Sequence, residues 1–458
     1  MRIGDPCGTT NHVIDDIPLY LRRVIANHPP MRWLLGLAIY RVALPLLFIA
    51  AFPGWILKMA RRGGFGTKLY ERLAIHTSAP DFEPCGAIHI HSVSVGETQL
   101  ALKLIRLWRN DEPTRPFVIA TGTATGHAVA TAANLDGVRV TYAPLDFPGC
   151  VRRYLDRFEP SAIVMIEAEV WPHLVLACER RAIPTHLVNA RLSPRSARRF
   201  IHLAAWVRPM FQKLESVCTQ EAEDVNVWQK LGVAKTRVHH TGSLKFDPAG
   251  SDQPTRRPEF SEIISAFGKK RPVVLAISTH PGEEPWIASA IRDADPNALP
   301  VIVPRHAERR AEVAAALRNA GFLPVLRTRF ENPAPNAPAL LVIDTTGELR
   351  DWTAHADVVI IGKSFLARGG QNPCEAIQAG KPVITGPHMD NFQPLATRLL
   401  EKNATLAATD QATLAAAIRR ALDPATAREL THRATDVLAS HQGATERIIQ
   451  QIRHPRQP

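Results

Sequence analysis

Two carboxylates and one lysine are the side chains best suited to chemistry in the first half of the chain. Glu97 lies in the segment HSVSVGET and Glu167 in the segment EAEVWP, and each segment follows a short apolar run. Lys245 lies in the later segment GSLKFD. A carboxylate at such a position can accept the proton of an attacking hydroxyl group, and a lysine can hold an anionic group. The structural alternatives are a glutamate that only favours a helix dipole, solvated loop carboxylates and a surface lysine.

The second half of the chain carries four loops that are rich in hydrogen-bond donors. They are STHPGEE (278–284), PRHAER (304–309), DTTGEL (344–349) and GGQNPCE (369–375). The second loop supplies Arg305 and His306. In the last loop, Asn372 as N-cap and Pro373 at the first helical position predict a helix start with free backbone N–H groups for a phosphate, and Glu375 would close a capping box or reach a ribose hydroxyl. Four such loops in one domain favour a nucleotide site over coincidence.

Short β-branched runs that alternate with longer helix-like stretches position these loops. Such alternation predicts parallel sheets covered by helices, with ligand sites at the carboxyl ends of the strands. The polar, proline-bearing stretch 247–258 interrupts the alternation and predicts a linker between two α/β domains. The expected strands before the linker are 87–91, 117–121, 138–142, 162–166 and 185–189, and those after it are 273–277, 301–303, 340–343, 358–361 and 382–385.

The composition of the chain favours some classes of binding partner and disfavours others. The 458 residues carry a net charge of +12, which suits nucleic acid, an anionic membrane surface or an anionic substrate. No run of five basic residues and no basic stretch interleaved with aromatic residues occurs, so nucleic acid is disfavoured. Six cysteines without a C-x-x-C pair argue against a zinc ribbon or a disulfide framework and indicate a reducing compartment. The one D-x-D segment, Asp293 to Asp295, is expected at the surface, and no metal site is expected.

An apolar segment near the N-terminus predicts a membrane anchor. Between Trp33 and Leu57 the only charged residue is Arg41, and basic residues follow. The length of this segment allows either a spanning helix or one that lies in the membrane interface. Pro45 and Pro53 disfavour the alternative of a buried core helix. A cleaved signal peptide fits poorly, because about thirty mixed residues precede the segment.

Nine segments of the chain follow one another in a fixed order. They are HSVSVGET, E-x-E-x-W-P, NARLS-x-RS, GSLKFD, STH-x-GEE, PRH-x-ER, D-T-x-GEL, GG-x-NP-x-E and GPH-x-x-NF. In this order they closely resemble the motifs of the Kdo (3-deoxy-D-manno-octulosonic acid) transferases of lipopolysaccharide synthesis. The resemblance extends from about Tyr70 to Gln442, and nine ordered motifs are far more specific than any single one.

This resemblance implies an α/β fold of the GT-B type, with two doubly wound Rossmann-like domains facing a cleft and an N-terminal membrane-anchor helix. It implies a glycosyltransferase that moves Kdo from CMP-Kdo to a lipid A precursor, with inversion and without a metal ion or other cofactor. The partners would be the CMP-Kdo donor, the lipid A precursor and membrane lipid, at the cytoplasmic side of the inner membrane. The domains would be the anchor at 31–62, an acceptor-binding domain at 63–247 and a CMP-sugar-binding domain at 258–458. Residues 1–30 are an extension that the family pattern does not explain.

The same resemblance assigns roles to individual residues. Glu97 would be the proton acceptor, and Glu167 and Lys245 would stabilise the transition state. A helix N-terminus would lower the pKa of Glu97 and weaken it as a base, so apolar surroundings must offset this effect. The nucleotide would be contacted by residues of three loops, namely Pro304, Arg305, Thr346, Gly347, Glu348, Asn372, Pro373, Cys374 and Glu375.

The chain departs from the family pattern in three motifs. It reads EAEVWPH where the family has ETELWPN, Lys363 replaces the second glycine of GGS, and Gln371 replaces the histidine of GGHNP. These changes flank the assigned residues and bear on acceptor choice more than on activity. Two alternatives remain: another GT-B enzyme, a transferase or an epimerase, that uses a different nucleotide sugar, and a non-catalytic CMP-sugar-binding membrane protein.

Overall fold

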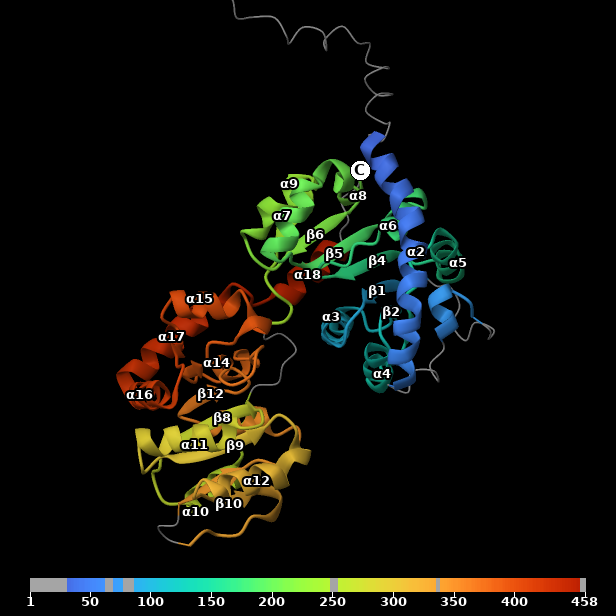
Figure 1. Cartoon of the computed structure of the whole chain (residues 1–458). Coiled ribbons are helices and arrows are strands. Elements are labelled where there is room, and N and C mark those ends of the chain that lie inside the picture. Colours follow the sequence, from blue (N-terminus) through green and yellow to red (C-terminus); the bar gives the residue numbers. More distant parts are fainter. Residues whose placement is uncertain (1–30, 62–68, 77–85, 248–253, 335–337, 454–458) are drawn as a thin grey trace, which may run out of the picture. The chain divides into compact units, whose positions relative to one another are not determined.

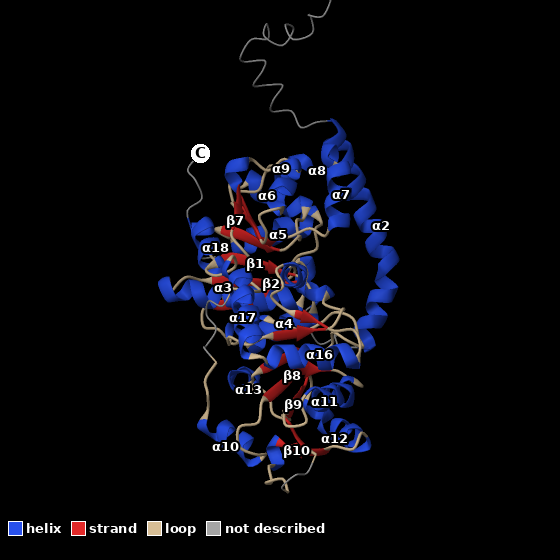
Figure 2. Ribbon diagram, turned by 90° about the vertical axis from the view of Figure 1, so that its left-hand side faces the viewer, coloured by secondary structure: helices blue, strands red, loops and turns tan. Residues whose placement is uncertain are grey.

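The computed structural model describes residues 31–61, 69–76, 86–247, 254–334 and 338–453. These residues form two α/β units, each of which is described by itself. Unit 1 comprises the described residues up to Lys245 and those from Gly443 onward, and unit 2 extends from Phe246 to Gln442. Each unit contains a seven-stranded sheet whose paired strands are all parallel, with helices packed against it (Figures 1 and 2). The expected extension at 1–30 lies outside the described residues.

The sheet of unit 1 has the strand order β3-β2-β1-β4-β5-β6-β7. The first strand, β1, lies in the middle of the sheet; β2 and β3 follow on one side of it and β4 to β7 on the other. The order in which strands are added therefore reverses between β1 and β4. All five expected strands form, each within one residue of its expected bounds. Two further short strands, β6 and β7, extend the sheet. The strands are β1 (Ile88–Ser92), β2 (Phe117–Thr121), β3 (Val138–Tyr142), β4 (Ala162–Ile166), β5 (Thr185–Ala190), β6 (Ser216–Thr219) and β7 (Val238–His240).

Helices cover both faces of this sheet, because successive strand residues point to opposite sides. In β4, Ile163 and Met165 pack in a cluster with α5, α6, α8 and α9, whereas Val164 and Ile166 pack with α3, α4 and α18. The helices are α2 (Met31–Arg61), α3 (Val95–Asp111), α4 (Ala124–Ala132), α5 (Pro148–Phe158), α6 (Pro172–Arg180), α7 (Pro194–His202), α8 (Ala204–Phe211), α9 (Asp224–Lys230) and α18 (Ala444–Arg453), with 3-10 turns η2 (Leu69–Leu73) and η3 (Lys235–Arg237).

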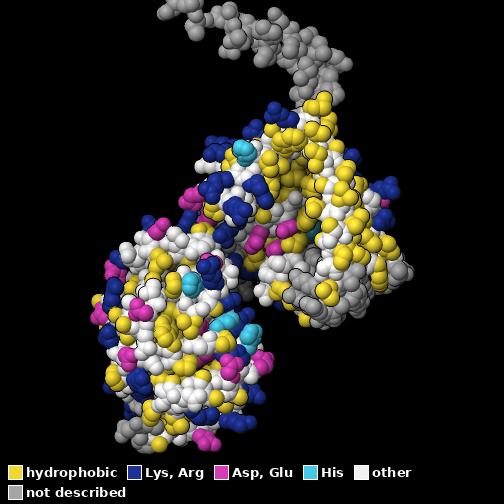
Figure 3. All heavy atoms as spheres, viewed as in Figure 1, with side chains coloured by type: hydrophobic (Ala, Val, Ile, Leu, Met, Phe, Trp, Pro, Cys, Tyr) yellow, Lys and Arg dark blue, Asp and Glu magenta, His cyan; other side chains and the backbone are white. Residues whose placement is uncertain are grey.

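Helix α2 is the apolar N-terminal segment. Its part Met31–Gly54 has a mean hydropathy of 2.1 and is long enough to cross a membrane. Trp33 is buried in the core of unit 1, and the helix packs against α8 (Figure 1). Most of its other large apolar side chains are exposed and form a hydrophobic band along the helix in Figure 3, among them Leu34, Leu35, Ile39, Val42, Leu46, Leu47, Ile49 and Phe52.

The last helix returns to unit 1. Ile448, Ile449 and Ile452 of α18 are buried in the same cluster as the inner face of α3. Arg453 adds ion pairs with Asp111 and Glu112 at the end of α3. The burial of this apolar face explains why the second unit, expected at 258–458, ends at Gln442 in the structure.

Unit 2 has the strand order β10-β11-β9-β8-β12-β13-β14, and the order in which strands are added reverses between β8 and β12. The five expected strands are again present, and two edge strands, β10 and β14, were not expected. The strands are β8 (Val273–Thr279), β9 (Leu299–Pro304), β10 (Leu323–Leu326), β11 (Ala339–Val342), β12 (Val358–Ile361), β13 (Val383–Thr385) and β14 (Leu406–Ala407).

The helices of unit 2 also cover both sheet faces. Val273 and Leu275 of β8 pack with α10, α13 and α15, whereas Val274 and Ala276 pack with α11, α12 and α16. The helices are α10 (Pro258–Ala266), α11 (Glu283–Ala294), α12 (Arg310–Asn319), α13 (Leu349–His355), α14 (Cys374–Gln378), α15 (Leu395–Glu401), α16 (Gln411–Leu422) and α17 (Pro424–Ala439), with 3-10 turns η4 (Ala307–Arg309), η5 (Arg327–Arg329) and η6 (Asp390–Phe392).

Candidate active site

Glu97 lies at the switch point of unit 1, between β1 and β4, where the strand order reverses. β1 and β4 are neighbours in that sheet, and α3 begins directly after β1. Ser94 is the N-cap of α3, and its hydroxyl oxygen accepts a hydrogen bond from the Glu97 N–H at 3.3 Å. Doubly wound sheets bind ligands at this switch point, beyond the carboxyl ends of the strands. The local sequence therefore places a carboxylate where such folds hold their ligands.

The carboxylate of Glu97 is fixed by two hydrogen bonds. The Val93 N–H donates to Oε2 at 2.8 Å, and the Ser94 hydroxyl donates to Oε1 at 2.8 Å. Burial raises the pKa of Glu97 and outweighs these two hydrogen bonds, which lower it. The pKa of Glu97 is thus raised overall, as expected if Glu97 is a base at a helix N-terminus, because a higher pKa makes the carboxylate a better proton acceptor.

Two more carboxylates follow β4 at the same switch point. Glu167 adopts a left-handed backbone conformation with φ 63°, and its N–H donates to the Val188 carbonyl at 2.9 Å. Burial raises the pKa of Glu167 and of Glu169, while the charges of Lys245 and Arg191 lower that of Glu167. The negative charges of Glu167 and Glu169 also raise the pKa of Glu97. We call Glu97, Glu167 and Glu169 the acidic edge of unit 1.

Asn189 holds the segment that carries Lys245. Its backbone is left-handed, with φ 53°, at the end of β5. The side-chain oxygen of Asn189 accepts hydrogen bonds from the Leu244 N–H at 3.0 Å and from the Ser243 hydroxyl at 3.3 Å. The side chain of Lys245 is exposed beyond this fixed segment, within electrostatic range of Glu167. The structure thus brings Glu97, Glu167 and Lys245 to one edge of one sheet.

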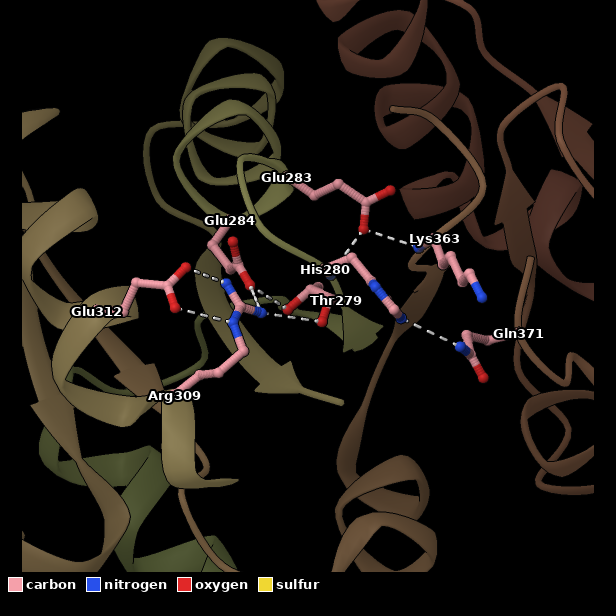
Figure 4. Close-up of polar contacts among 8 residues, drawn as sticks. All are labelled: Thr279, His280, Glu283, Glu284, Arg309, Glu312, Lys363 and Gln371. Atoms are coloured by element: carbon pink, nitrogen blue, oxygen red, sulfur yellow. Dashed lines mark hydrogen bonds and ion pairs between the residues drawn. The ribbon is translucent and has the colours of Figure 1, made fainter. Parts of the chain in front are cut away.

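In unit 2, one buried glutamate joins the two loops at the switch point. Glu283 is fully buried at the start of α11. Its Oε2 atom accepts the His280 N–H at 2.9 Å and the Lys363 N–H at 2.7 Å, as Figure 4 shows. His280 follows β8 and Lys363 follows β12, and these strands are neighbours. Glu283 therefore ties together the two loops between which the strand order reverses.

A second glutamate holds an arginine away from any ligand. Glu284 accepts hydrogen bonds from the Thr279 hydroxyl at 3.1 Å and from Arg309 at 2.9 Å, and Arg309 also pairs with Glu312 (Figure 4). Arg305 of the same PRHAER loop has an exposed side chain, and its N–H donates to the Thr279 carbonyl at 3.0 Å. Of these two arginines, Arg305 is the one placed to meet an anion.

Cationic groups gather at the carboxyl edge of this sheet. Burial lowers the pKa of His280, and the positive charges of Lys363, Arg309 and His306 lower it further. We call His280, Arg305, His306 and Lys363 the basic edge of unit 2. Positive charges at a strand-end switch point are suited to a phosphate or a carboxylate.

The other residues expected at the nucleotide come from three loops of unit 2. Pro304 is buried at the end of β9, and Thr346 and Gly347 are exposed after β11. The Glu348 carboxylate accepts a hydrogen bond from the Thr345 hydroxyl and pairs with Arg327 at 3.6 Å. β9 and β11 are neighbours, so both loops emerge at the same edge of the sheet.

The GGQNPCE loop differs in detail from its expected form. Helix α14 begins at Cys374, one residue after the expected first position Pro373. The Asn372 side chain still caps the turn, because its oxygen accepts the Cys374 N–H at 3.0 Å. Cys374 is buried, whereas Glu375 is partly exposed. Pro373 occupies the N-cap position of α14, without a side-chain cap hydrogen bond.

Sequence reasoning had left several residues of the two edges without a role. Asn189, Arg191 and Glu283 lie in segments that the sequence marked as motifs. Asn189 is the penultimate residue of β5, Arg191 directly follows that strand, and Glu283 begins α11 after β8. Their contacts depend on which strands are neighbours, which a motif does not specify. Among the residues that the structure describes, no group of three or more His, Cys, Asp or Glu side chains could hold a metal ion.

Solved structures share this arrangement of two doubly wound units. A glycosyltransferase from Rickettsia africae matches with a TM-score of 0.51 and 10% identity, covering 80% of this chain and 98% of that chain. A UDP-GlcNAc 2-epimerase from Neisseria meningitidis matches with a TM-score of 0.52 and 11% identity, covering 80% of this chain and 99% of that chain. At these identities the likeness concerns the fold, which is of the GT-B type. The expected fold class is confirmed.

Relatives of known activity identify the family. Residues 67–248 match the family described as 3-deoxy-D-manno-octulosonic-acid transferase (kdotransferase). The 3-deoxy-D-manno-octulosonic acid transferase of Bordetella pertussis is 35% identical over 438 residues, 91% of this chain and 98% of that protein. The enzyme of the same name from Haemophilus influenzae is 32% identical over 387 residues, 83% of this chain and 90% of that protein. The chain belongs to the Kdo transferase family and is a glycosyltransferase.

Proposed function

We propose that the chain transfers Kdo from CMP-Kdo to a hydroxyl group of a lipid A precursor, with inversion, without a metal ion and with Glu97 as the general base. The observation that supports this most strongly is the geometry of Glu97. Its carboxylate is buried, held by Val93 and Ser94, and has a raised pKa at the switch point of unit 1. A glutamate that only favoured the helix dipole would not need burial beside two other carboxylates.

The reaction is a single displacement at the anomeric carbon of Kdo. The acceptor oxygen attacks on the face opposite the phosphate, and its proton passes to the Glu97 carboxylate. The bond between the anomeric carbon and the phosphate oxygen breaks with its electron pair on oxygen, and CMP leaves. Positive charge develops on the sugar, which Glu167 stabilises, while Lys245 and Arg305 stabilise negative charge on the phosphate.

The nucleotide of the donor binds at the carboxyl edge of the sheet of unit 2. Arg305 contacts the phosphate, and the loops around Gly347 and Asn372 contact the rest of CMP. The exposure of Arg305 supports this assignment, because the neighbouring Arg309 is already paired with two glutamates. The full set of proposed contacts is Pro304, Arg305, Thr346, Gly347, Glu348, Asn372, Pro373, Cys374 and Glu375.

A cavity of unit 1 supports a lipid acceptor. It has a volume of about 370 Å³ and is lined by Phe48 of α2, by Val93 and by Trp171, among others. Val93 is the residue whose N–H holds Glu97, so the cavity extends from the apolar helix to a neighbour of the proposed base. Arg72 also lines the cavity, where a cation suits a phosphorylated lipid.

Helix α2 anchors the chain to the inner membrane, with both units on the cytoplasmic side. The contacts of α2 favour a helix that lies in the interface over one that spans the bilayer. Trp33 is buried in unit 1, Tyr40 donates a hydrogen bond to Asp146 at 3.0 Å, and Phe48 packs edge-on against Phe147. From Trp33 to Phe48 the helix covers about 22 Å, most of a hydrocarbon core, while in contact with unit 1.

The proposal is tested by a donor screen with the purified full chain in detergent. CMP-Kdo generated in situ, a UDP-sugar and a GDP-sugar are each offered with a lipid A precursor. We expect transfer from CMP-Kdo alone. Transfer from another nucleotide sugar would favour a different GT-B activity, and CMP binding without transfer from any donor would favour a non-catalytic binding protein.

A further inference from the structure

The loop that follows β12 presents a lysine from an unusually constrained backbone. Gly362 leaves no room for a side chain, since a Cβ atom would lie 2.6 Å from the Ser278 carbonyl oxygen. The next residue, Lys363, is left-handed with φ 56°, a conformation that favours glycine. The family pattern has glycine at this position. The chain therefore accepts backbone strain in order to carry a lysine there.

Buried hydrogen bonds hold this loop on both sides of Lys363. Glu283 accepts the Lys363 N–H at 2.7 Å and the Phe365 N–H at 3.3 Å. The buried Ser364 hydroxyl donates to the Ile361 carbonyl and accepts the Gly386 N–H at 2.7 Å. The backbone of Lys363 is thus fixed at the switch point, so its side chain projects from a defined place at the edge of the sheet.

Lys363 and Gln371 lie next to the same histidine. The Gln371 side-chain nitrogen is 3.4 Å from His280 Nε2, and the two side chains of Lys363 and Gln371 lie on the same side of His280 in Figure 4. The charge of Lys363 also contributes to lowering the pKa of His280. Within the described residues, the Lys363 ammonium group has no hydrogen bond or ion pair.

These two residues are both departures from the family pattern, which has glycine at 363 and histidine at 371. We propose that Lys363 binds an anionic group of the donor and takes the place of the imidazole that Gln371 has replaced. The exchange moves a basic side chain from one position to another within the segment between β12 and α14, while keeping it beside His280 at the switch point. This inference rests on the proposed function, because it assumes that the donor binds at this edge.

The anionic group is either the phosphate of CMP or the carboxylate of Kdo, since both suit an ammonium group. Two measurements distinguish them. CMP carries the phosphate but not the Kdo carboxylate, so of these two groups only the phosphate contributes to the Kd of CMP, measured by calorimetry. Both groups contribute to the KM for CMP-Kdo. Lys363→Gly should raise the KM about 10-fold while kcat changes much less, because a charge-assisted hydrogen bond is lost. A parallel rise of the CMP Kd identifies the phosphate, and an unchanged Kd identifies the carboxylate.

The matched control is Lys270→Gly. Lys270 is left-handed like Lys363, with φ 61°, and is exposed, whereas Lys363 is half-buried; it lies in unit 2 before β8, at the amino end of that strand. This change removes the same charge and relieves the same strain away from the basic edge. It should leave both constants unchanged. Lys363→Arg, which keeps the charge, should stay close to wild type.

The decisive variant adds Gln371→His to Lys363→Gly. At pH 6.5 an imidazole is partly protonated, so the double variant should recover most of the lost donor affinity. Wild-type constants for Lys363→Gly would overturn the inference, and so would a loss that neither arginine at 363 nor histidine at 371 restores. If the wild-type chain itself neither binds CMP nor uses CMP-Kdo, the proposed function fails, which is a different outcome from either of these.

Discussion

The side chains of the acidic edge of unit 1 and those of the basic edge of unit 2 are opposite in character, although both units have the same doubly wound architecture. The acidic edge of unit 1 combines three glutamates whose pKa values are all raised, chiefly by burial. The basic edge of unit 2 presents Arg305 and Lys363, and the pKa of His280 there is lowered by burial and by the charge of Lys363. The difference teaches that the fold decides where a ligand binds, whereas the strand-end residues decide the chemistry. Unit 1 is suited to accept a proton and unit 2 to hold an anion.

Glu97→Gln should have the largest effect of any single change at the acidic edge. The amide keeps the shape of the side chain but cannot accept the proton, so kcat should fall roughly 10²–10⁴-fold. The Kd of CMP should stay nearly unchanged, because the nucleotide belongs to the other unit. Steady-state kinetics and calorimetry on the same preparation measure the two quantities.

Glu169→Gln provides the matched control for that change. Glu169 is also a partly buried carboxylate of the acidic edge, and burial likewise raises its pKa. Its loss should lower kcat by less than about tenfold, since it is not the proposed base. A larger loss of kcat for Glu169→Gln than for Glu97→Gln would show that our proposal assigns the role of base to the wrong carboxylate.

Arg305→Ala should produce the converse result at the basic edge. The loss of a charge-assisted hydrogen bond should weaken CMP binding by about 1.5–3 kcal/mol, roughly 10- to 150-fold. Arg318→Ala, an exposed arginine near the far end of α12, should leave CMP binding unchanged. Unaltered CMP affinity in Arg305→Ala, measured by calorimetry, would move the nucleotide away from this loop.

The pH dependence of stability sharpens the electrostatic side of the comparison. The raised pKa of folded Glu97 means that its contribution to stability is complete below the pKa of the unfolded chain and is lost as the pH rises through the folded pKa. At pH 8, Glu97→Gln should therefore raise the Tm, because the amide carries no charge that burial penalises. The gain should shrink toward pH 4. Melting curves in which the variant is less stable at pH 8 would contradict the cost assigned to the buried charge.

Chelation should have the smallest effect. If side chains alone handle the phosphate charge, EDTA should leave transfer from preformed CMP-Kdo within about twofold of its original rate. The assay must start from preformed donor, so that the synthesis of CMP-Kdo is not tested at the same time. Activity that vanishes with EDTA and returns with magnesium would contradict metal-independent transfer and make Asp293 and Asp295, or Glu167 and Glu169, the candidate ligands.

The sequence predicted the central strands well and missed three of the four edge strands, β7, β10 and β14. The runs 117–121, 162–166 and 358–361 coincide with strands because apolar residues buried on both faces form continuous runs. The edge strand β3 was also predicted with its exact bounds, although it contains Arg139 and is only partly buried. β10 contains Pro324 and lies at an edge, where a missing N–H is tolerated. β7 has only three residues, and β14 only two. Such short segments form because a neighbouring strand is present, which their own composition does not reveal.

The candidate site shows the same division between local and long-range information. The position of Glu97 at N3 of α3 follows from the local sequence, since Ser94 is a good N-cap and an apolar helical face follows it. The contact of Asn189 with Leu244 joins residues 55 positions apart, and Glu283 reaches Lys363 across 80 positions. These contacts depend on strand order, so the motifs could mark the residues but could not say which of them meet.

Mass spectrometry of the lipid product tests the central claim most directly. The purified full chain is incubated with a lipid A precursor and CMP-Kdo generated in situ, and a parallel reaction omits CMP-Kdo. Our account predicts a lipid that carries Kdo only in the complete reaction. A lipid that stays unmodified although the chain is folded and binds CMP would contradict the assignment of this protein as a CMP-Kdo-dependent transferase.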